Sequence, residues 1–251
     1  MCGRATLVIS TDDIAEVFGV APSLPPGPPR FNLAPGQDLV AIRPTTAGDL
    51  PKLASQPSSA REMAAVRWGL VPWWSNDKKI GNRTINARSE TLVNAPAFRD
   101  AFKARRCLVV VDGFYEWEKT GDPKTKRPHH IRYEDRRPFT LAGVWDRWTN
   151  KADGEVLESC SIVTTAAHGA IIRLHDRMPL VLAEKDRDLW LGSADDARTV
   201  LAHAKATQEA RAHELVLVPV SRRVNDVRND DPSCLEPPDA DPLPKQTSLF
   251  E

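Results

Sequence analysis

Residues 107–118 read CLVVVDGFYEWE, and this stretch carries the most information about the fold. Four apolar residues, three of them valine, follow Cys107, which is typical of a buried strand. Asp112 and Gly113 form a turn signal, and a second run of aromatic residues alternating with glutamate comes directly after it. The stretch therefore predicts a strand, a tight turn and a second strand.

Further runs of the same kind lie on both sides of it. We expect about seven or eight strands in all, with main runs at 39–44, 64–74, 137–148, 159–167 and 214–221. Helices are expected at 11–20, with a threonine or aspartate cap, at 94–106 with Asn94 as cap, and at 184–192 and 196–213. The six prolines of 21–37 predict an irregular loop, and 119–130 is expected to be another.

This spacing does not follow regular strand–helix–strand units. It favours an α+β fold with a mainly antiparallel, barrel-like β core and peripheral helices. With 251 residues, the chain is expected to form one domain over 1–237. The remaining residues, 238–251, are rich in proline and aspartate and lack core-forming side chains, so we expect a disordered tail.

Charge is balanced overall but not along the chain. Lys plus Arg and Asp plus Glu both number 34. Residues 61–106 carry ten basic side chains against four acidic ones, whereas 225–251 carry seven acidic against two basic. A neutral protein with a basic middle could present a phosphate-binding face, or its charges could simply be scattered and solvated.

No apolar run is long enough for a signal peptide or a membrane span. The four cysteines, which lie far apart without CxxC spacing, are expected to be free thiols in a reducing compartment. We expect a cytoplasmic location, beside the nucleoid in a bacterium, or a nuclear one in a eukaryote. The histidines do not cluster at ligand spacings, so we expect no metal and no cofactor.

Cys2 follows Met1 directly, and Met is removed before small residues. The mature chain would then begin with an amine and a thiol on one residue. The amine titrates near pH ~8 and could condense with an aldehyde, after which the thiol could close a thiazolidine. Cys2 could instead be an N-terminal thiol nucleophile with its own amine as base, or have no role.

Other residues could carry proton transfer or nucleic-acid contacts. Glu116 lies between Tyr115 and Trp117, where a raised pKa would suit proton transfer, unless it is an exposed strand residue. His175, in the loop segment LHDRMP, could be a general acid or base or a surface histidine.

The segment INARSET places Asn86, Arg88 and Glu90 on one face of an extended segment, where they could line a cleft or simply face water. Trp73 and Trp74 follow Pro72, where burying both would be difficult. Exposed tryptophans beside basic residues suit base stacking and phosphate binding.

Taken together, the motifs resemble the SOS response-associated peptidase (SRAP) family, whose members shield abasic sites in single-stranded DNA. The matching blocks run from Cys2 to about Pro237 and are MCGR, FNLAPGQ, WGLVPWW, INARSET, RRCLVVVDGFYEW, FTLAGVWDRW, CSIVTTAA, LHDRMPLVL and PVSRRVNDVRNDDPSCLEP. The pair Trp73–Trp74 departs from many relatives, which have one tryptophan after a small or polar residue.

The resemblance implies roles for particular residues. Cys2 would bond covalently to the ring-opened sugar, Asn86 would position Cys2 or the sugar, and Glu116 and His175 would transfer protons. The implied DNA contacts are Arg4, Arg88, Asn32, Pro35, Trp73, Trp74 and Trp117. The partner would be single-stranded DNA with abasic sites, without a membrane, and we expect a monomer.

The resemblance also implies an enzyme: an autoproteolytic cysteine peptidase acting on its own N-terminus, with abasic-site lyase-type chemistry. An aminopeptidase could equally remove Met1. An MCG start occurs in class II glutamine amidotransferases too, although no glutamine-binding motif is found here. A non-covalent reader of modified DNA would need the basic cleft and the tryptophans but no free Cys2.

Overall fold

The two halves of the segment 107–118 form strands that belong to different sheets. In the computed structural model, which describes residues 2–45, 61–118, 126–192 and 196–238, β6 (Arg106–Val111) ends at Asp112 and β7 (Gly113–Glu118) starts at the next residue. The two strands do not pair with each other, so the predicted tight turn is wrong. Asp112 is instead the point where the chain crosses from one sheet to the other.

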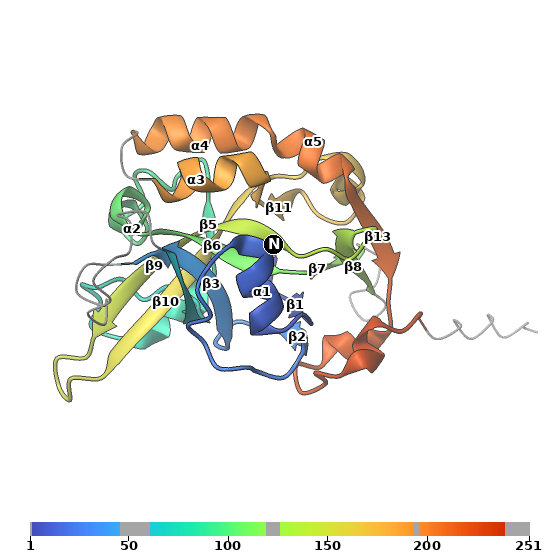
Figure 1. Cartoon of the computed structure of the whole chain (residues 1–251), viewed down its shortest axis with the longest axis horizontal. Helices are drawn as coiled ribbons and strands as arrows, with labels where there is room; N and C mark the ends of the chain where they lie inside the picture. The colour runs from blue at the N-terminus through green and yellow to red at the C-terminus, as the bar shows by residue number, and fades with distance from the viewer. Residues whose placement is uncertain (1, 46–60, 119–125, 193–195, 239–251) are drawn as a thin grey trace, which may run out of the picture.

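The first sheet closes on itself into a five-stranded barrel (Figure 1). Its strands are β3 (Asp38–Pro44), β4 (Arg61–Trp68), β6, β9 (Phe139–Thr149) and β10 (Val156–Ala166). Four of the five pairings are antiparallel and only β4–β10 is parallel. All six residues of β6 are buried, which its run of apolar side chains predicts. The barrel-like α+β core is thus confirmed.

Three short strands extend the barrel at β10 and β9. They are β5 (Asn86–Arg88) and β11 (Arg177–Pro179), which both pair with β10, and β12 (Val181–Leu182), which pairs with β9. β5 falls within the segment INARSET, which the sequence predicts to be extended. These additions bring segments distant in sequence to one end of β10.

The second sheet is antiparallel throughout, in the order β13–β8–β7–β1–β2. Its bounds are β1 (Ala5–Leu7), β2 (Arg30–Leu33), β7, β8 (Arg127–Tyr133) and β13 (Leu215–Pro219). Two predictions are corrected here. β2 lies inside the supposed proline-rich loop, where Asp230 accepts hydrogen bonds from two of its backbone amides, and β8 occupies the end of the second expected loop.

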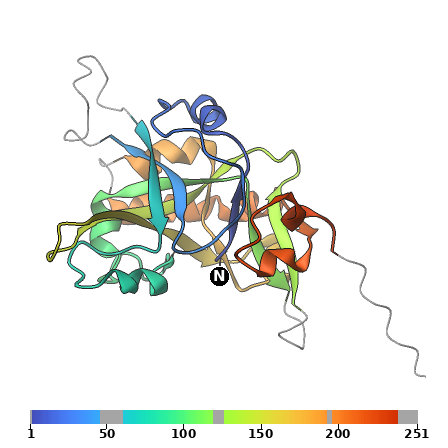
Figure 2. The ribbon, with the colours of Figure 1, turned by 90° about the horizontal axis from the view of Figure 1, so that it is seen from below.

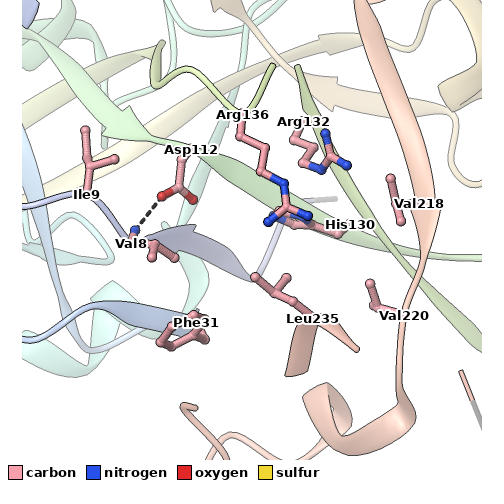
Figure 3. Close-up of a pocket in the computed structure, with 10 residues that line it drawn as sticks. All are labelled: Val8, Ile9, Phe31, Asp112, His130, Arg132, Arg136, Val218, Val220 and Leu235. Carbon is pink, nitrogen blue, oxygen red and sulfur yellow. Dashed lines mark hydrogen bonds between the residues drawn. The ribbon is translucent and has the colours of Figure 1, made fainter. Parts of the chain in front are cut away.

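Asp112 and Gly113 hold the crossing point in place. The Asp112 carboxylate accepts hydrogen bonds from the Thr6 hydroxyl and from the Val8 amide, the latter drawn as a dashed line in Figure 3. The buried ring of His130 lies over Gly113, and a Cβ atom there would stand 2.0 Å from its Nε2. Glycine is needed at this position for close packing and not for a hairpin turn.

The helices are peripheral, as expected. α3 (Arg187–Leu191), α4 (Ala197–Ala206) and α5 (Gln208–His213) lie together at one side of the molecule, coloured orange in Figure 1. α1 (Thr11–Phe18) is capped by Ser10 in a capping box with Asp13, not by the predicted threonine or aspartate. α2 (Arg99–Ala104) starts at Arg99 without a side-chain cap, so Asn94 is not its cap.

Short 3₁₀ helices complete the fold. They are η1 (Lys78–Arg83), η3 (Gly169–Arg173), η4 (Glu184–Asp186), η5 (Arg222–Asn225) and η6 (Pro232–Leu235). Figure 2 shows the last two, in red, against the second sheet. Among the described residues, no helix has the length and apolar character needed to cross a bilayer. The predicted tail, from 239 onward, lies outside the described residues.

Candidate active site

Cys2 lies three residues before the start of β1, which pairs with β7 on one side and β2 on the other. Its side chain is fully buried and joins the main hydrophobic core, although chain ends are usually exposed. Burial raises the pKa of the Cys2 thiol well above its ordinary value, and the negative charge of Glu116 raises it further. The thiol is therefore neutral at physiological pH in the chain that still carries Met1.

Asn86 reaches Cys2 from the other sheet. It is the first residue of β5, and its side-chain Nδ2 donates a hydrogen bond to the Cys2 carbonyl oxygen over 2.7 Å. The alternation predicted for this strand is confirmed, because Ala87 and Ser89 are buried while Arg88 and Glu90 are exposed. The cysteine thus lies at the seam between the two sheets.

Glu116 is buried in the middle of β7, on the opposite face from Tyr115 and Trp117. Those two rings pack against each other and into a second cluster of apolar residues with Val220 and Val224. Burial raises the pKa of Glu116, and the nearby charge of Asp176 adds to that effect. The predicted direction is confirmed, but its cause is burial between the sheets and not the neighbouring aromatic rings.

His175 lies between η3 and β11 with a side chain that is 25% exposed. Its Nδ1 accepts a hydrogen bond from the backbone amide of Arg177 over 2.9 Å and lies 2.8 Å from Asp176 Oδ1. Because the charge of Asp176 acts on Glu116, the His175 loop is within electrostatic reach of the carboxyl. Asn86 thus contacts Cys2, the charge of Glu116 acts on Cys2, and the charge of Asp176, the neighbour of His175, acts on Glu116.

Arg4 and Asn32 have most of their hydrogen-bonding capacity engaged within the protein. Arg4 donates to Asn32 Oδ1 over 2.8 Å and to the Val224 carbonyl over 2.6 Å. The Asn32 amide donates to three carbonyls, those of Val224, Asp226 and Asn229. Since Asn32 is fully buried, it has no surface for direct contact with DNA, and its contacts indicate that it supports Arg4.

The Arg4 guanidinium is half-buried and lies 6.0 Å from the centre of the Trp117 ring, near enough for a cation–π contact. Trp117 donates through Nε1 to Asn225 Oδ1 over 2.7 Å. Pro35 is exposed in the turn that follows β2, where Gly36 has a φ of 89°. Arg4 and Trp117 thus form a positively charged, aromatic edge beside Cys2.

Trp73 and Trp74 are the most exposed tryptophans of the described residues, at 57% and 40%. They lie in a turn closed by a hydrogen bond from the Ser75 amide to the Pro72 carbonyl, so the expected exposure of both is confirmed. Lys79, Arg83 and Arg88 are exposed nearby in sequence, and none of them forms an ion pair with another residue that the structure describes. This combination suits stacked bases and phosphates.

Sequence reasoning missed the residues that hold the site together. Asn225 accepts the Trp117 hydrogen bond, and Arg177 pairs with Glu90 through two bonds of 2.9 Å. Both lie inside the quoted blocks, at VNDVRND and LHDRMP. Only the pairing of distant segments could show their role.

A pocket of about 220 Å³ lies on the face of the second sheet that is opposite to Glu116 (Figure 3). It is lined by apolar side chains together with Asp112, His130, Arg132 and Arg136. His130 pairs with Tyr115 across the strands, so it faces away from Glu116. None of the predicted site residues lines this pocket.

Comparison with known proteins agrees with the sequence pattern. Residues 1–227 match the family model described as SOS response associated peptidase (SRAP). The Abasic site processing protein YoqW of Bacillus subtilis is 35% identical over 238 residues, which cover 94% of this chain and 99% of that protein. The Abasic site processing protein HMCES of Gallus gallus is 33% identical over 72% of this chain and 59% of its own length.

The fold has a counterpart among solved structures. A crystal structure of a protein from Bacteroides thetaiotaomicron superposes with a TM-score of 0.77, covering 94% of this chain and 99% of that one. The two sequences are 22% identical, so this likeness supports the fold alone.

Proposed function

Because the chain belongs to the SOS response associated peptidase (SRAP) family, we propose that it captures abasic sites in single-stranded DNA through a covalent bond to Cys2. The observation that carries this proposal is the 2.7 Å hydrogen bond from Asn86 to the Cys2 carbonyl, with Glu116 close enough to act on the thiol. The names of the relatives, which describe abasic-site processing, support the choice of substrate.

Release of Met1 is the first step of the proposed reaction. Until then the Cys2 nitrogen is part of a peptide bond and cannot act as a nucleophile, and the thiol is buried. Release yields an α-amine with a pKa of about 8, a fair fraction of which is neutral at physiological pH. Either the chain itself or an aminopeptidase performs this hydrolysis.

The α-amine then adds to the aldehyde carbon of the ring-opened deoxyribose. Loss of one water molecule gives an imine, and the thiol sulfur adds to the imine carbon while its proton passes to the nitrogen. The product is a five-membered thiazolidine, and the whole reaction releases one water. A stable ring removes the imine, from which β-elimination would cut the strand in an abasic-site lyase reaction.

Glu116 and His175 serve as the proton carriers. A carboxyl whose pKa is raised by burial keeps its proton closer to neutral pH, so it can protonate the departing hydroxyl and later accept a proton. His175 assists ring opening at the sugar and the reverse reaction. Arg88 and Arg4 neutralise phosphates, and Trp73, Trp74 and Trp117 stack on flanking bases.

The test uses a single-stranded oligonucleotide with one abasic site. We expect a protein–DNA band that survives denaturing electrophoresis, loss of that band in Cys2→Ala, and no loss in Cys234→Ala, which removes another buried free thiol. An oligonucleotide with a tetrahydrofuran analogue, which has no aldehyde, should give no band. A resistant band that persists in Cys2→Ala overturns the proposal.

Two rival functions give different results in the same experiment. A non-covalent reader would bind the oligonucleotide without any resistant band, whether or not Met1 is present. An N-terminal-nucleophile amidotransferase would release ammonia from glutamine, and Cys2→Ala would abolish that activity. Intact mass of the purified protein shows whether Met1 has been lost.

A further inference from the structure

Asn86 begins β5, and His175 lies two residues before β11. Both of these strands pair with β10. β5 pairs with β10 from Ile162 to Thr164, and β11 pairs with β10 from Thr164 to Ala166. Thr164 is therefore bracketed by Arg88 on one side and Pro179 on the other. Both β5 and β11 have only three residues, so few ladder hydrogen bonds hold them in place.

The side chain of Arg177, in β11, reaches across β10 to Glu90, which follows β5. Its guanidinium donates to both carboxylate oxygens of Glu90 over 2.9 Å, and to the backbone carbonyl and hydroxyl of Thr164 over 2.7 and 3.2 Å. The Arg177 side chain is only 14% exposed. A bidentate pair of this kind fixes the relative orientation of the guanidinium and the carboxylate as well as the distance between them. Glu90 follows β5 by two residues, so the pair ties β5 to β11 across β10.

The same arginine touches the His175 ring through its backbone. Its amide hydrogen points at Nδ1 over 2.9 Å, and Asp176 Oδ1 lies 2.8 Å from the same nitrogen, so these two contacts fix the orientation of the ring. The amide can hold the ring only if Arg177 itself is held in place. The ion pair with Glu90 and the bonds to Thr164 do so.

We propose that Glu90 and Arg177 are positioning residues that hold the His175 ring, through the Arg177 amide, in the orientation that the reaction needs. This inference rests on the function proposed above. It also separates the two arginines of the region, since Arg88 is exposed and available for phosphate while Nη1 and Nη2 of Arg177 are engaged by Glu90 and Thr164.

A double-mutant cycle tests the proposal. The rate of crosslink formation is measured with protein in excess for the wild type, Glu90→Gln, His175→Ala and the double variant, alongside the dissociation constant for intact single-stranded DNA. We expect Glu90→Gln to slow the wild-type reaction by about tenfold or more, and to slow His175→Ala by less than about twofold. DNA affinity should change by less than about twofold, since the residues proposed to contact DNA, Arg88 and the tryptophans among them, are unchanged in these variants.

Two further variants complete the design. Glu214→Gln breaks an Arg–carboxylate pair with Arg211 remote from the site and should leave the rate unchanged. Arg177→Lys keeps the charge but loses the fork, and it should be as slow as Glu90→Gln. A wild-type rate in Arg177→Lys would point to simple phosphate binding and overturn the inference.

The outcomes separate this inference from the function on which it rests. If the wild type forms no crosslink, the proposed function fails. Suppose the wild type forms the crosslink, and Glu90→Gln slows the wild type and His175→Ala by the same factor. The proposed function then stands. In that case Glu90 and Arg177 do not act through His175.

Discussion

The side-chain amide of Asn86 and the backbone carbonyl of Cys2 are joined by a 2.7 Å hydrogen bond across 84 positions of sequence. Asn86 lies in β5, which extends the barrel at β10, and Cys2 lies in the segment that leads into the second sheet. This bond orients the peptide group that follows the Cys2 α-carbon. It therefore constrains the direction in which the amine and thiol of a processed Cys2 would point.

Asn86→Ala should slow crosslinking strongly while costing little stability. A single lost hydrogen bond is worth about 1 kcal/mol, whereas misplacing a nucleophile affects the rate more steeply. Asn82→Ala, which truncates an exposed asparagine of η1, is the matched control. Crosslinking rates and thermal denaturation check this, and equal rates in the two variants would contradict it.

Glu116→Gln should stabilise the protein at neutral pH and slow the reaction. Because burial raises the pKa of Glu116 in the folded state, the unfolded chain loses its proton first as pH rises, and folding stability falls until the folded pKa is reached. Glutamine cannot ionise and avoids that loss. We expect a higher Tm than wild type at pH 8, with the difference vanishing near pH 4. A Tm gain that is the same at both values would exclude this cause.

Trp73→Ala and Trp74→Ala should weaken binding to single-stranded DNA without unfolding the protein. Both side chains are exposed, and stacking on a base contributes about 1–3 kcal/mol. Val17→Ala, which truncates an exposed apolar residue on α1, serves as the control. Fluorescence anisotropy measures the affinities. Binding equal to that of the control would remove both tryptophans from the interface.

Gly113→Ala should destabilise the fold by about 1–3 kcal/mol, the usual cost of overpacking a core. The added Cβ would meet the His130 ring at 2.0 Å, and that ring is buried beside the Thr6 hydroxyl at 3.0 Å. Gly27→Ala has no atom within 4 Å of the new Cβ and is the comparison. Denaturant unfolding gives both free energies. Equal values would mean that His130 moves aside at no cost.

The amino-acid sequence by itself determined the class of fold and the identities of the residues at the site. Hydrophobic runs of strand length, such as 107–111, report burial directly, because each residue's own side chain carries the signal. The exposure of Trp73 and Trp74 also followed from local chemistry, since Pro72 ends the preceding segment. Motif resemblance named Cys2, Asn86, Glu116 and His175 together.

Only the tertiary structure decided how those residues meet. The Asp112–Gly113 pair looks like a hairpin turn, and nothing local shows that it instead joins two sheets under a histidine from β8. Likewise Asn32 looks like a cleft residue until its burial is seen, and the Glu90–Arg177 pair spans 87 positions. Such contacts depend on strand pairing between distant segments. The local sequence of a segment does not specify which distant segment it will pair with.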